Sequence, residues 1–255
     1  MNQRVTQRLR LPGSHGGAWL TIGSPVITEL AAAFEFEWML LDLEHGYCTE
    51  ATLLSSLQAG KSADTALIVR VGQLNPAWIG RVLDWGADGI MLPHVNTAEQ
   101  AVSCVDAMLY PPGGSRGFSS SVRAFRYGMD PYRSDEVNPL FFAQIETCEG
   151  VANAEAIAQV PGVDVLFVGP SDLRMDYDLY GKGQFADFSS ALARVVKAAR
   201  AAGKQAGILA KSPEDVSNYR QIGFTTVAYG SDLSFLREGL KKAKDILGPA
   251  DLQGD

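Results

Sequence analysis

Short apolar runs alternate with longer amphipathic segments along almost the whole chain. The runs predict eight strands, at residues 18–22, 38–42, 66–70, 89–92, 141–145, 164–168, 205–209 and 225–228. Apolar residues at helical spacing predict helices near residues 25–33, 49–63, 76–85, 97–108, 150–159, 185–202, 213–222 and 232–247. Eight strand-then-helix units indicate parallel strands, and the lack of a ninth favours closure into a barrel. We therefore predict an α/β fold, a single-domain (β/α)8 TIM barrel spanning residues 1–255 with its core at about 17–247.

Residues typical of helix ends support these boundaries. Prolines at first-turn positions follow three candidate N-caps, Ser24, Asn75 and Ser212. Glycines that would adopt the left-handed conformation follow three helix ends, at Gly86, Gly203 and Gly223.

Composition and charge narrow the class of protein. The chain has 255 residues, a net charge of -7 and no basic stripe interleaved with aromatic residues, which argues against a nucleic-acid partner. No apolar run approaches the roughly 18 residues of a membrane span, and the first residues lack the apolar region of a signal peptide. Three cysteines without a C-x-x-C pair are typical of reduced thiols. We expect a cytoplasmic enzyme that does not act at a membrane.

Two carboxylates follow neighbouring predicted strands. Glu146 comes after the strand at 141–145, and Asp172 follows the strand at 164–168 within Gly-Pro-Ser-Asp. Parallel strands bring both acids to the same carboxyl edge, and Gln144 shares a strand face with Glu146. Two converging carboxylates repel each other unless a cation lies between them, so a divalent metal is the first hypothesis. The alternative is that both are surface acids that cap the following helices.

Further candidates lie at the same edge. The second strand ends in Asp42, Glu44 and His45, and a histidine there suits a general base because its ordinary pKa lies near neutrality. Arg70 ends the third strand, where it is either buried without a partner or faces the pocket mouth and binds an anion; we favour the second. Asp84, late in a helix, opposes the helix dipole and should have a specific partner, for which His45 is a candidate.

Other residues are weighed and given smaller roles. A connection of about thirty residues before residue 141 is long enough to suggest function, and it carries Arg116, Arg123, Arg126 and Arg133. Arg116, Arg123 and Arg126 either meet an anionic substrate or are ordinary surface arginines. His94 at the end of the fourth strand is interpreted as structural and Cys148 as a small filler. Lys211 is a weak Schiff-base candidate because its surroundings, AKSPED, are hydrophilic.

At this point the sequence resembles the HpcH/HpaI aldolase family, the metal-dependent class II pyruvate aldolases. The segments that carry the resemblance are SPVITEL, LLDLEHG, IVRV, LDWGADGIMLPHVNTAEQA, YPPGGSRG and QIETCEGVANAEAIAQVPGVDVLFVGPSDL. The similarity runs from about residue 19 to 247, essentially the whole barrel.

The resemblance implies a metal site and a substrate site. It implies that Glu146 and Asp172 bind Mg²⁺ or Mn²⁺, with Co²⁺ possible, and that pyruvate is bound by the metal, Gln144 and the Ser171–Asp172 backbone. It implies an aldolase that reversibly cleaves a 4-hydroxy-2-oxo acid to pyruvate and an aldehyde through a metal-stabilised enolate.

It also implies the catalytic residues and the assembly. His45 is expected to be the base, Asp84 to raise its basicity, and Arg70 to steady the enolate. The last helix, 232–247, is expected to pack on a neighbouring barrel in a homohexamer, although its apolar stripe would equally close its own barrel. The chain departs from the family pattern at Glu35 and Glu37, where Gly and Asp are usual. The alternatives are a citrate-forming condensation, a citramalyl-thioester lyase, or a non-catalytic 2-oxoacid-binding protein.

Overall fold

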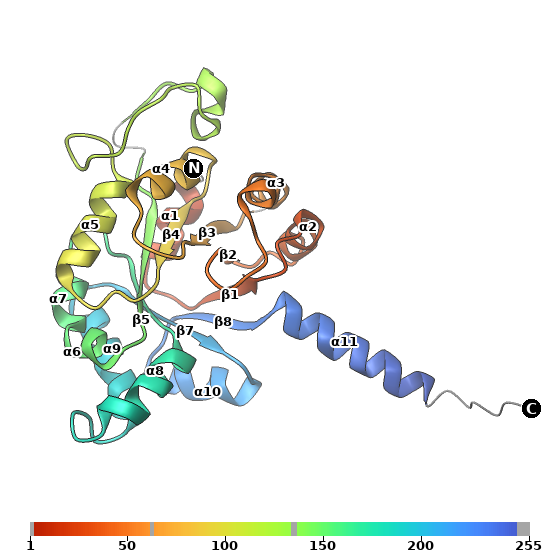
Figure 1. The fold of residues 1–255 in the computed structure, drawn as a ribbon, viewed down its shortest axis with the longest axis vertical. Helices are drawn as coiled ribbons and strands as arrows, with labels where there is room; N and C mark the ends of the chain where they lie inside the picture. Colours follow the sequence, from red (N-terminus) through yellow and green to blue (C-terminus); the bar gives the residue numbers. More distant parts are fainter. Residues whose placement is uncertain (1–2, 62–63, 134–136, 249–255) are drawn as a thin grey trace, which may run out of the picture.

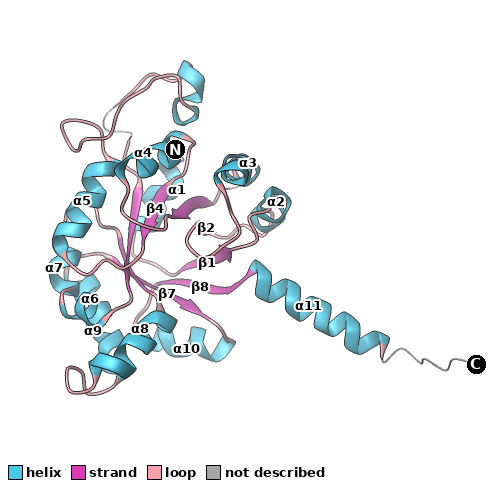
Figure 2. Ribbon diagram, viewed as in Figure 1, coloured by secondary structure: helices cyan, strands magenta, loops and turns pink. Residues whose placement is uncertain are grey.

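A computed structural model describes residues 3–61, 64–133 and 137–248. Eight parallel strands follow one another in chain order and close into a barrel, with β1 pairing both β2 and β8. Their bounds are β1 His15–Leu20, β2 Trp38–Asp42, β3 Ala66–Arg70, β4 Gly89–Leu92, β5 Leu140–Ile145, β6 Val165–Val168, β7 Gln205–Ala210 and β8 Thr226–Ser231. The predicted (β/α)8 fold is confirmed (Figures 1 and 2).

Helices surround the barrel. They are α1 Gln3–Arg10, α2 Pro25–Ala32, α3 Glu50–Gly60, α4 Pro76–Asp84, α5 Ala98–Met108, α6 Cys148–Ala152, α7 Ala154–Gln159, α8 Pro170–Asp176, α9 Phe188–Ala201, α10 Pro213–Ile222 and α11 Asp232–Leu247. Ser24, Asn75 and Ser212 cap α2, α4 and α10 as predicted. Gly86, Gly203 and Gly223 have positive φ, also as predicted. Positions 62 and 63 of the helix predicted at 49–63 lie outside the described residues.

Several elements differ from the sequence prediction. The first strand begins at His15 instead of residue 18. The helix predicted at 150–159 is two helices, α6 and α7, which meet at Asn153, whose side-chain amide donates to the Asn96 carbonyl at 2.8 Å. The helix α8 was not predicted, although Pro170 at its first position favours a helix start.

The helix α1, also not predicted, covers the amino-terminal end of the barrel. Val5 and Leu9 are buried in the same cluster as the side chains that fill the barrel interior. Arg10 donates to Asp164, just before β6, at 2.7 Å. Because this end is covered, the open mouth lies at the carboxyl ends of the strands.

The long connection after α5 packs against the outside of the barrel. It contains a 3₁₀ segment, Arg123–Gly128, and an aromatic cluster of Tyr110, Phe118, Phe125 and Tyr132. Arg123 donates to the carbonyls of Trp85 and Leu57 at 2.6 and 3.2 Å. This arginine therefore fixes the connection to α3 and α4 and does not meet a substrate. Positions 134–136 of the connection lie outside the described residues.

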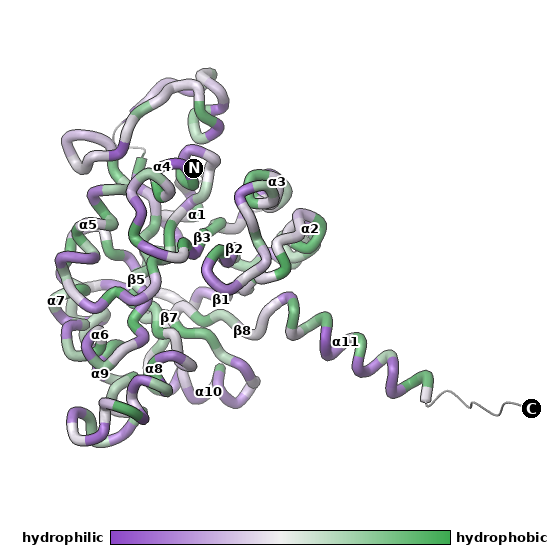
Figure 3. Tube along the Cα trace, viewed as in Figure 1, coloured by the Kyte–Doolittle hydropathy of each residue, from purple (hydrophilic) through white to green (hydrophobic). Residues whose placement is uncertain are grey.

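The last helix, α11, projects away from the barrel (Figure 1). Asp232, at its start, accepts hydrogen bonds from the Thr21 and Ile22 amides at 2.8 and 3.0 Å. Beyond Asp232 the helix exposes apolar side chains, seen as repeated hydrophobic bands in Figure 3: Leu233, Phe235, Leu236, Leu240, Ile246 and Leu247. No helix in the described ranges has the length and apolar character needed to cross a membrane.

Candidate active site

Glu146, directly after β5, lies at the carboxyl edge of the barrel with 2% of its surface exposed. Its Oε1 accepts a hydrogen bond from the His94 backbone amide at 2.8 Å, and its Oε2 accepts one from Gln144 Nε2 at 2.5 Å. Gln144 and Glu146 share a strand face, as predicted. The carboxylate is therefore held in one orientation by neighbours on β4 and β5.

His94 holds Glu146 in two ways. Its φ is +51°, an uncommon conformation for a residue with a side chain. In this conformation the backbone amide donates to Glu146 Oε1, and the ring Nδ1 lies 3.3 Å from the same oxygen. The ring itself is 59% exposed and faces the mouth. We had interpreted His94 as a structural group; it contacts the predicted metal ligand directly.

A close turn between β6 and α8 brings Asp172 to the same place. A Cβ at Gly169 would overlap Glu146 Oε2 and crowd Gln144 Nε2, so only glycine lets this turn approach so closely. Ser171 and Asp172, both exposed, lie in the first turn of α8 immediately afterwards. The two predicted metal ligands therefore converge, as the strand order required.

The electrostatics of Glu146 favour a cation. Burial raises the pKa of Glu146 against the opposing effect of the His94 amide and ring, and the negative charges of Glu44 and Asp172 raise it further. The carboxylates of Glu44, Glu146 and Asp172 thus lie close enough at the barrel mouth for their charges to repel one another. A bound cation would relieve the repulsion and stabilise the ionised form.

The donor set fits a hard divalent ion that keeps open positions. No group of three or more His, Cys, Asp or Glu side chains placed to hold a metal occurs in the described part of the chain. Glu146 and Asp172 supply two carboxylates, and Gln144 Oε1 beside them is buried without a hydrogen-bond partner. An ion held by two carboxylates would complete its shell with substrate and water oxygens, which suits Mg²⁺ or Mn²⁺.

Arg70 has carboxylate partners that the sequence argument did not include. Its Nε and Nη2 form a bidentate pair with Asp42 at 3.0 and 2.6 Å, and its Nη1 lies 2.7 Å from Glu44 Oε2. The last contact is an ion pair by distance, but its angle does not make a hydrogen bond. The guanidinium also lies 4.8 Å from the centre of the Trp19 ring. Arg70 is therefore buried and paired, a possibility that the sequence argument omitted.

The two acids beside Arg70 differ in their ionisation. Burial raises the pKa of Asp42, but the hydrogen bonds and charge of Arg70 outweigh it, and the net pKa is lowered. For Glu44 burial outweighs Arg70, and the net pKa is raised. Asp42 is accordingly a fixed anion, whereas Glu44 more readily takes a proton. Sequence reasoning placed Glu44 at this edge but gave it no role.

His45 lies on the loop after β2. Its backbone amide, like that of Glu44, donates to Asp42 Oδ1, at 3.2 and 3.0 Å respectively. The side chain is exposed, and its charge acts on Glu44. The same carboxylate that pairs with Arg70 therefore also positions the candidate base.

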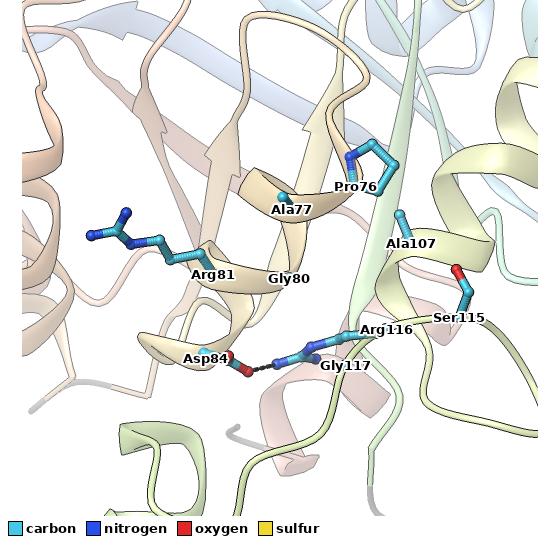
Figure 4. A pocket seen from close by; sticks show the side chains of 9 residues that line it. All are labelled: Pro76, Ala77, Gly80, Arg81, Asp84, Ala107, Ser115, Arg116 and Gly117. Atoms are coloured by element: carbon cyan, nitrogen blue, oxygen red, sulfur yellow. Dashed lines mark hydrogen bonds and ion pairs between the residues drawn. The ribbon is translucent and has the colours of Figure 1, made fainter.

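Asp84 lies away from this mouth. The helix α4 starts near the carboxyl end of β3 and runs back for nine residues, about 13 Å, so Asp84 at its end is near the opposite rim. There it pairs with Arg116 at 2.5 Å, beside a cavity of about 340 Å³ between α4, α5 and the following connection (Figure 4). Asp84 has the specific partner that we expected, but in this chain the partner is Arg116 and not His45. Arg116 is itself buried there and lines the cavity with Asp84.

The remaining candidates have ordinary roles. Arg126 is exposed and pairs with Asp130 four residues later. Cys148 is buried, and burial raises its pKa to about 11, so it stays a protonated thiol that fills space. Lys211, just after β7, donates to Ser171 Oγ at 2.8 Å.

Comparisons with known proteins show what the whole chain is similar to. The HpcH/HpaI aldolase/citrate lyase family profile matches residues 16–238. A 5-keto-4-deoxy-D-glucarate aldolase of Klebsiella pneumoniae is 38% identical over 231 residues, 90% of each chain. A solved HpcH/HpaI aldolase/citrate lyase family protein from Burkholderia cenocepacia superposes with a TM-score of 0.89 at 31% identity, covering 96% of this chain and 99% of that one. The citrate synthase SbnG superposes with a TM-score of 0.79 at 26% identity, covering 94% of each chain. The chain belongs to the HpcH/HpaI aldolase/citrate lyase family.

Proposed function

We propose that this carbon–carbon lyase is a metal-dependent aldolase that reversibly cleaves a 4-hydroxy-2-oxo acid into pyruvate and an aldehyde. The observation that carries the proposal is the buried Glu146 carboxylate, held by His94 and Gln144 and facing the charges of Glu44 and Asp172. The 38% identity to a 5-keto-4-deoxy-D-glucarate aldolase makes that compound the first substrate to test.

The groups around Glu146 bind the 2-oxo acid. In this proposal Glu146 and Asp172 hold a divalent ion, Mg²⁺ or Mn²⁺ with Co²⁺ possible, and the ion supplies Lewis acidity to the 2-oxo group. Gln144, whose Oε1 has no partner, and the Ser171–Asp172 backbone orient the substrate beside it.

Proton transfer falls to His45. The exposed ring accepts the proton of the C4 hydroxyl as the C3–C4 bond breaks, and Asp42 fixes the loop that carries it. Arg70 faces the oxygen that becomes negative; because Asp42 and Glu44 hold the guanidinium in place, little reorganisation is needed during the reaction.

An assay with a panel of aldehydes tests the proposal. Protein stripped with EDTA is reloaded with Mg²⁺, Mn²⁺ or Co²⁺, incubated with pyruvate and each aldehyde, and the products are identified by mass. We expect a metal-dependent condensation product and, in the cleavage direction, metal-dependent release of pyruvate. Absence of both with every ion would reject the aldolase.

A citrate-forming condensation is the second candidate, favoured by the superposition on SbnG. The same assay with oxaloacetate and acetyl-coenzyme A separates the two reactions, since the aldolase needs no thioester. A non-catalytic 2-oxoacid-binding protein would bind pyruvate and metal but release no product. We keep a cytoplasmic location as part of the proposal, in keeping with the free thiols of Cys48, Cys104 and Cys148.

We also propose that α11 packs on a second copy of the chain in a homohexamer. The helix exposes Leu236 and Leu240, and on its own barrel α2 exposes Val26 and Leu30 one turn apart. A helix from another copy would cover both apolar faces at once. Sedimentation at micromolar concentration is the test, and a purely monomeric protein would reject the exchange.

An oligomer would also allow the expected contact between Asp84 and His45. Because α4 carries Asp84 away from its own mouth, the expected contact requires Asp84 of one copy to meet His45 of another. Co-expression of His45→Ala and Asp84→Asn chains tests this. Mixed oligomers should regain activity above either variant alone if the pair forms between copies, and should regain none if each site uses its own Asp84.

A further inference from the structure

The connection between β4 and α5 takes an uncommon backbone conformation at His94, where φ is +51°. Among the described residues other than glycine, only Glu35, Arg126 and Tyr127 share a positive φ. A side chain in this left-handed region crowds its own backbone, so the conformation persists where neighbouring contacts impose it. Such positions occur preferentially at functional sites, and His94 lies beside the predicted metal ligand Glu146.

Contacts on both sides of His94 impose this conformation. Before it, Leu92 is buried and pairs with Ala143 of β5. After it, the Val95 amide donates to the Gln144 carbonyl of β5 at 3.0 Å, and the Val95 side chain is fully buried. The chain is thus fixed to β5 on either side, and the residue between these two attachments has to turn.

The turn directs two successive amides toward β5 and the residue after it. The His94 amide donates to Glu146 Oε1 at 2.8 Å, and the Val95 amide donates to the Gln144 carbonyl. Successive backbone amides in such a turn form a concave site for an anion. Gln144 Nε2 in turn donates to Glu146 Oε2 at 2.5 Å. Both oxygens of the carboxylate are therefore held by groups that are attached to each other.

The His94 ring makes a weaker contact than the amide. Its Nδ1 lies 3.3 Å from Glu146 Oε1, but the side chain is 59% exposed, so water screens the interaction. The amide is closer to the same oxygen, and its position is fixed by the attachment of Val95 to β5. The orientation of Glu146 should therefore depend on the backbone at residue 94 more than on the imidazole.

We propose that the left-handed backbone of residue 94, and not its imidazole ring, sets the orientation in which Glu146 binds a divalent ion. His94 is then a positioning residue that acts through Glu146. The inference rests on the metal site of the proposed function. It implies that residues that accept a positive φ can replace His94, whereas a β-branched residue cannot.

Titration of the metal-free protein with Mn²⁺, followed by calorimetry, tests the proposal without turnover. His94→Gly and His94→Asn, which accept a positive φ, should bind Mn²⁺ within about threefold of the wild type. His94→Val should turn the amide away from Glu146, because a β-branched side chain disfavours this region. We expect it to bind about 10- to 100-fold more weakly, the usual effect of losing a group that orients a metal ligand.

Glu35→Val is the matched control. Glu35 is exposed, has a φ of +56° and lies in the turn between α2 and β2, at the end of the barrel opposite the mouth. This variant puts the same β-branched residue at a second left-handed position. It should melt at a lower temperature than the wild type, as His94→Val should, but bind Mn²⁺ normally. Thermal melts followed by circular dichroism thus separate a loss of stability from a loss of the site.

Two results would overturn the role given to the backbone. An equal loss of affinity in His94→Gly, His94→Asn and His94→Val would assign the effect to the ring, and wild-type affinity in all three would show that residue 94 does not position Glu146. If His94→Val does not fold, the affinities of His94→Gly and His94→Asn still decide against the ring or for it. A wild-type protein that binds no Mn²⁺ would instead reject the metal site itself, so the two failures are distinguishable.

Discussion

Two clusters of charged residues share the mouth of this barrel and differ in how their charges are balanced. On β2 and β3, Arg70 lies between Asp42 and Glu44 at 2.6 and 2.7 Å. After β5 and in α8, Glu146 and Asp172 converge, and the exposed His94 ring lies 3.3 Å from Glu146. In the first cluster both carboxylates contact one buried guanidinium, whereas in the described ranges no buried cation contacts the carboxylates of the second.

The difference separates a structural role from a binding role. A buried ion pair whose partners neutralise each other holds a loop in place. Here that loop carries His45. A buried carboxylate whose pKa is raised by burial and by other acids is costly unless a ligand neutralises it. Removing residues from each cluster should therefore have opposite consequences.

The largest effect is expected at the unbalanced cluster. Glu146→Ala or Asp172→Ala should abolish measurable binding of Mg²⁺ or Mn²⁺ and leave the fold intact, because each residue lines the mouth and not the apolar core. Calorimetric metal titration is the measurement. Glu149→Ala, which removes an exposed carboxylate three residues later, is the matched control and should bind metal normally. An unchanged metal affinity in either site variant would contradict the assignment.

The next effect concerns the loop that the balanced cluster holds. His45→Ala should lower turnover by a factor of about 10² to 10⁴, the usual contribution of one general base. Its affinity for metal and pyruvate should persist, since the ring does not contact Glu146 or Gln144. Steady-state kinetics and pyruvate titration measure the two separately. A variant that cleaves a 4-hydroxy-2-oxo acid at near wild-type rate from pH 6 to 9 would show that another group is the base.

Arg70 should matter first for stability. Arg70→Ala leaves Asp42 and Glu44 facing each other in a buried site, and breaking such a pair costs about 3–5 kcal/mol. Arg81→Ala is the control, because its ion pair with Glu50 is more than half exposed and should contribute about 1 kcal/mol or less. Denaturant unfolding compares them. Equal small losses in both variants would mean that the Arg70 cluster is not structurally important.

The contrast also shows what the sequence could predict. Strand ends could be read from the apolar runs, and parallel order then placed Glu146, Asp172, His45 and Arg70 at one edge. The partners of Arg70 could not be predicted from the sequence, because they lie at the end of β2 and just after it, 28 and 26 residues earlier. The direction of α4 could have been predicted from the strand-then-helix order, but the sequence analysis did not use it. The helix runs back along the barrel and takes Asp84 away from the mouth.

Backbone conformation was a second limit. The positive φ of His94 is what aims its amide and ring at Glu146, and no local pattern signals it in a non-glycine residue. Glu35, flagged as occupying a glycine position, does have a φ of +56°. Glu37, directly before β2, accepts from the Gly16 amide at 2.9 Å and so connects the start of β2 to β1. The family pattern indicated the glycine position at Glu35, whereas the contact of Glu37 could be found only in the structure.

The smallest effect is the most specific to the unbalanced cluster. A carboxyl whose pKa is raised on folding adds stability below its unfolded pKa, about 4.3 for Glu, and this contribution is lost as the pH rises through the folded value. In metal-free protein Glu146→Gln should therefore raise the melting temperature at pH 7 by a few degrees, about 2–4 °C per kcal/mol, and change it little near pH 4. Added Mg²⁺ should reverse the order at pH 7, because the wild type gains the binding energy and the variant does not. Glu149→Gln serves as the control. A metal-free Glu146→Gln protein that melts below the wild type at pH 7 would mean that the carboxylate is already balanced, and the contrast between the two clusters would fail.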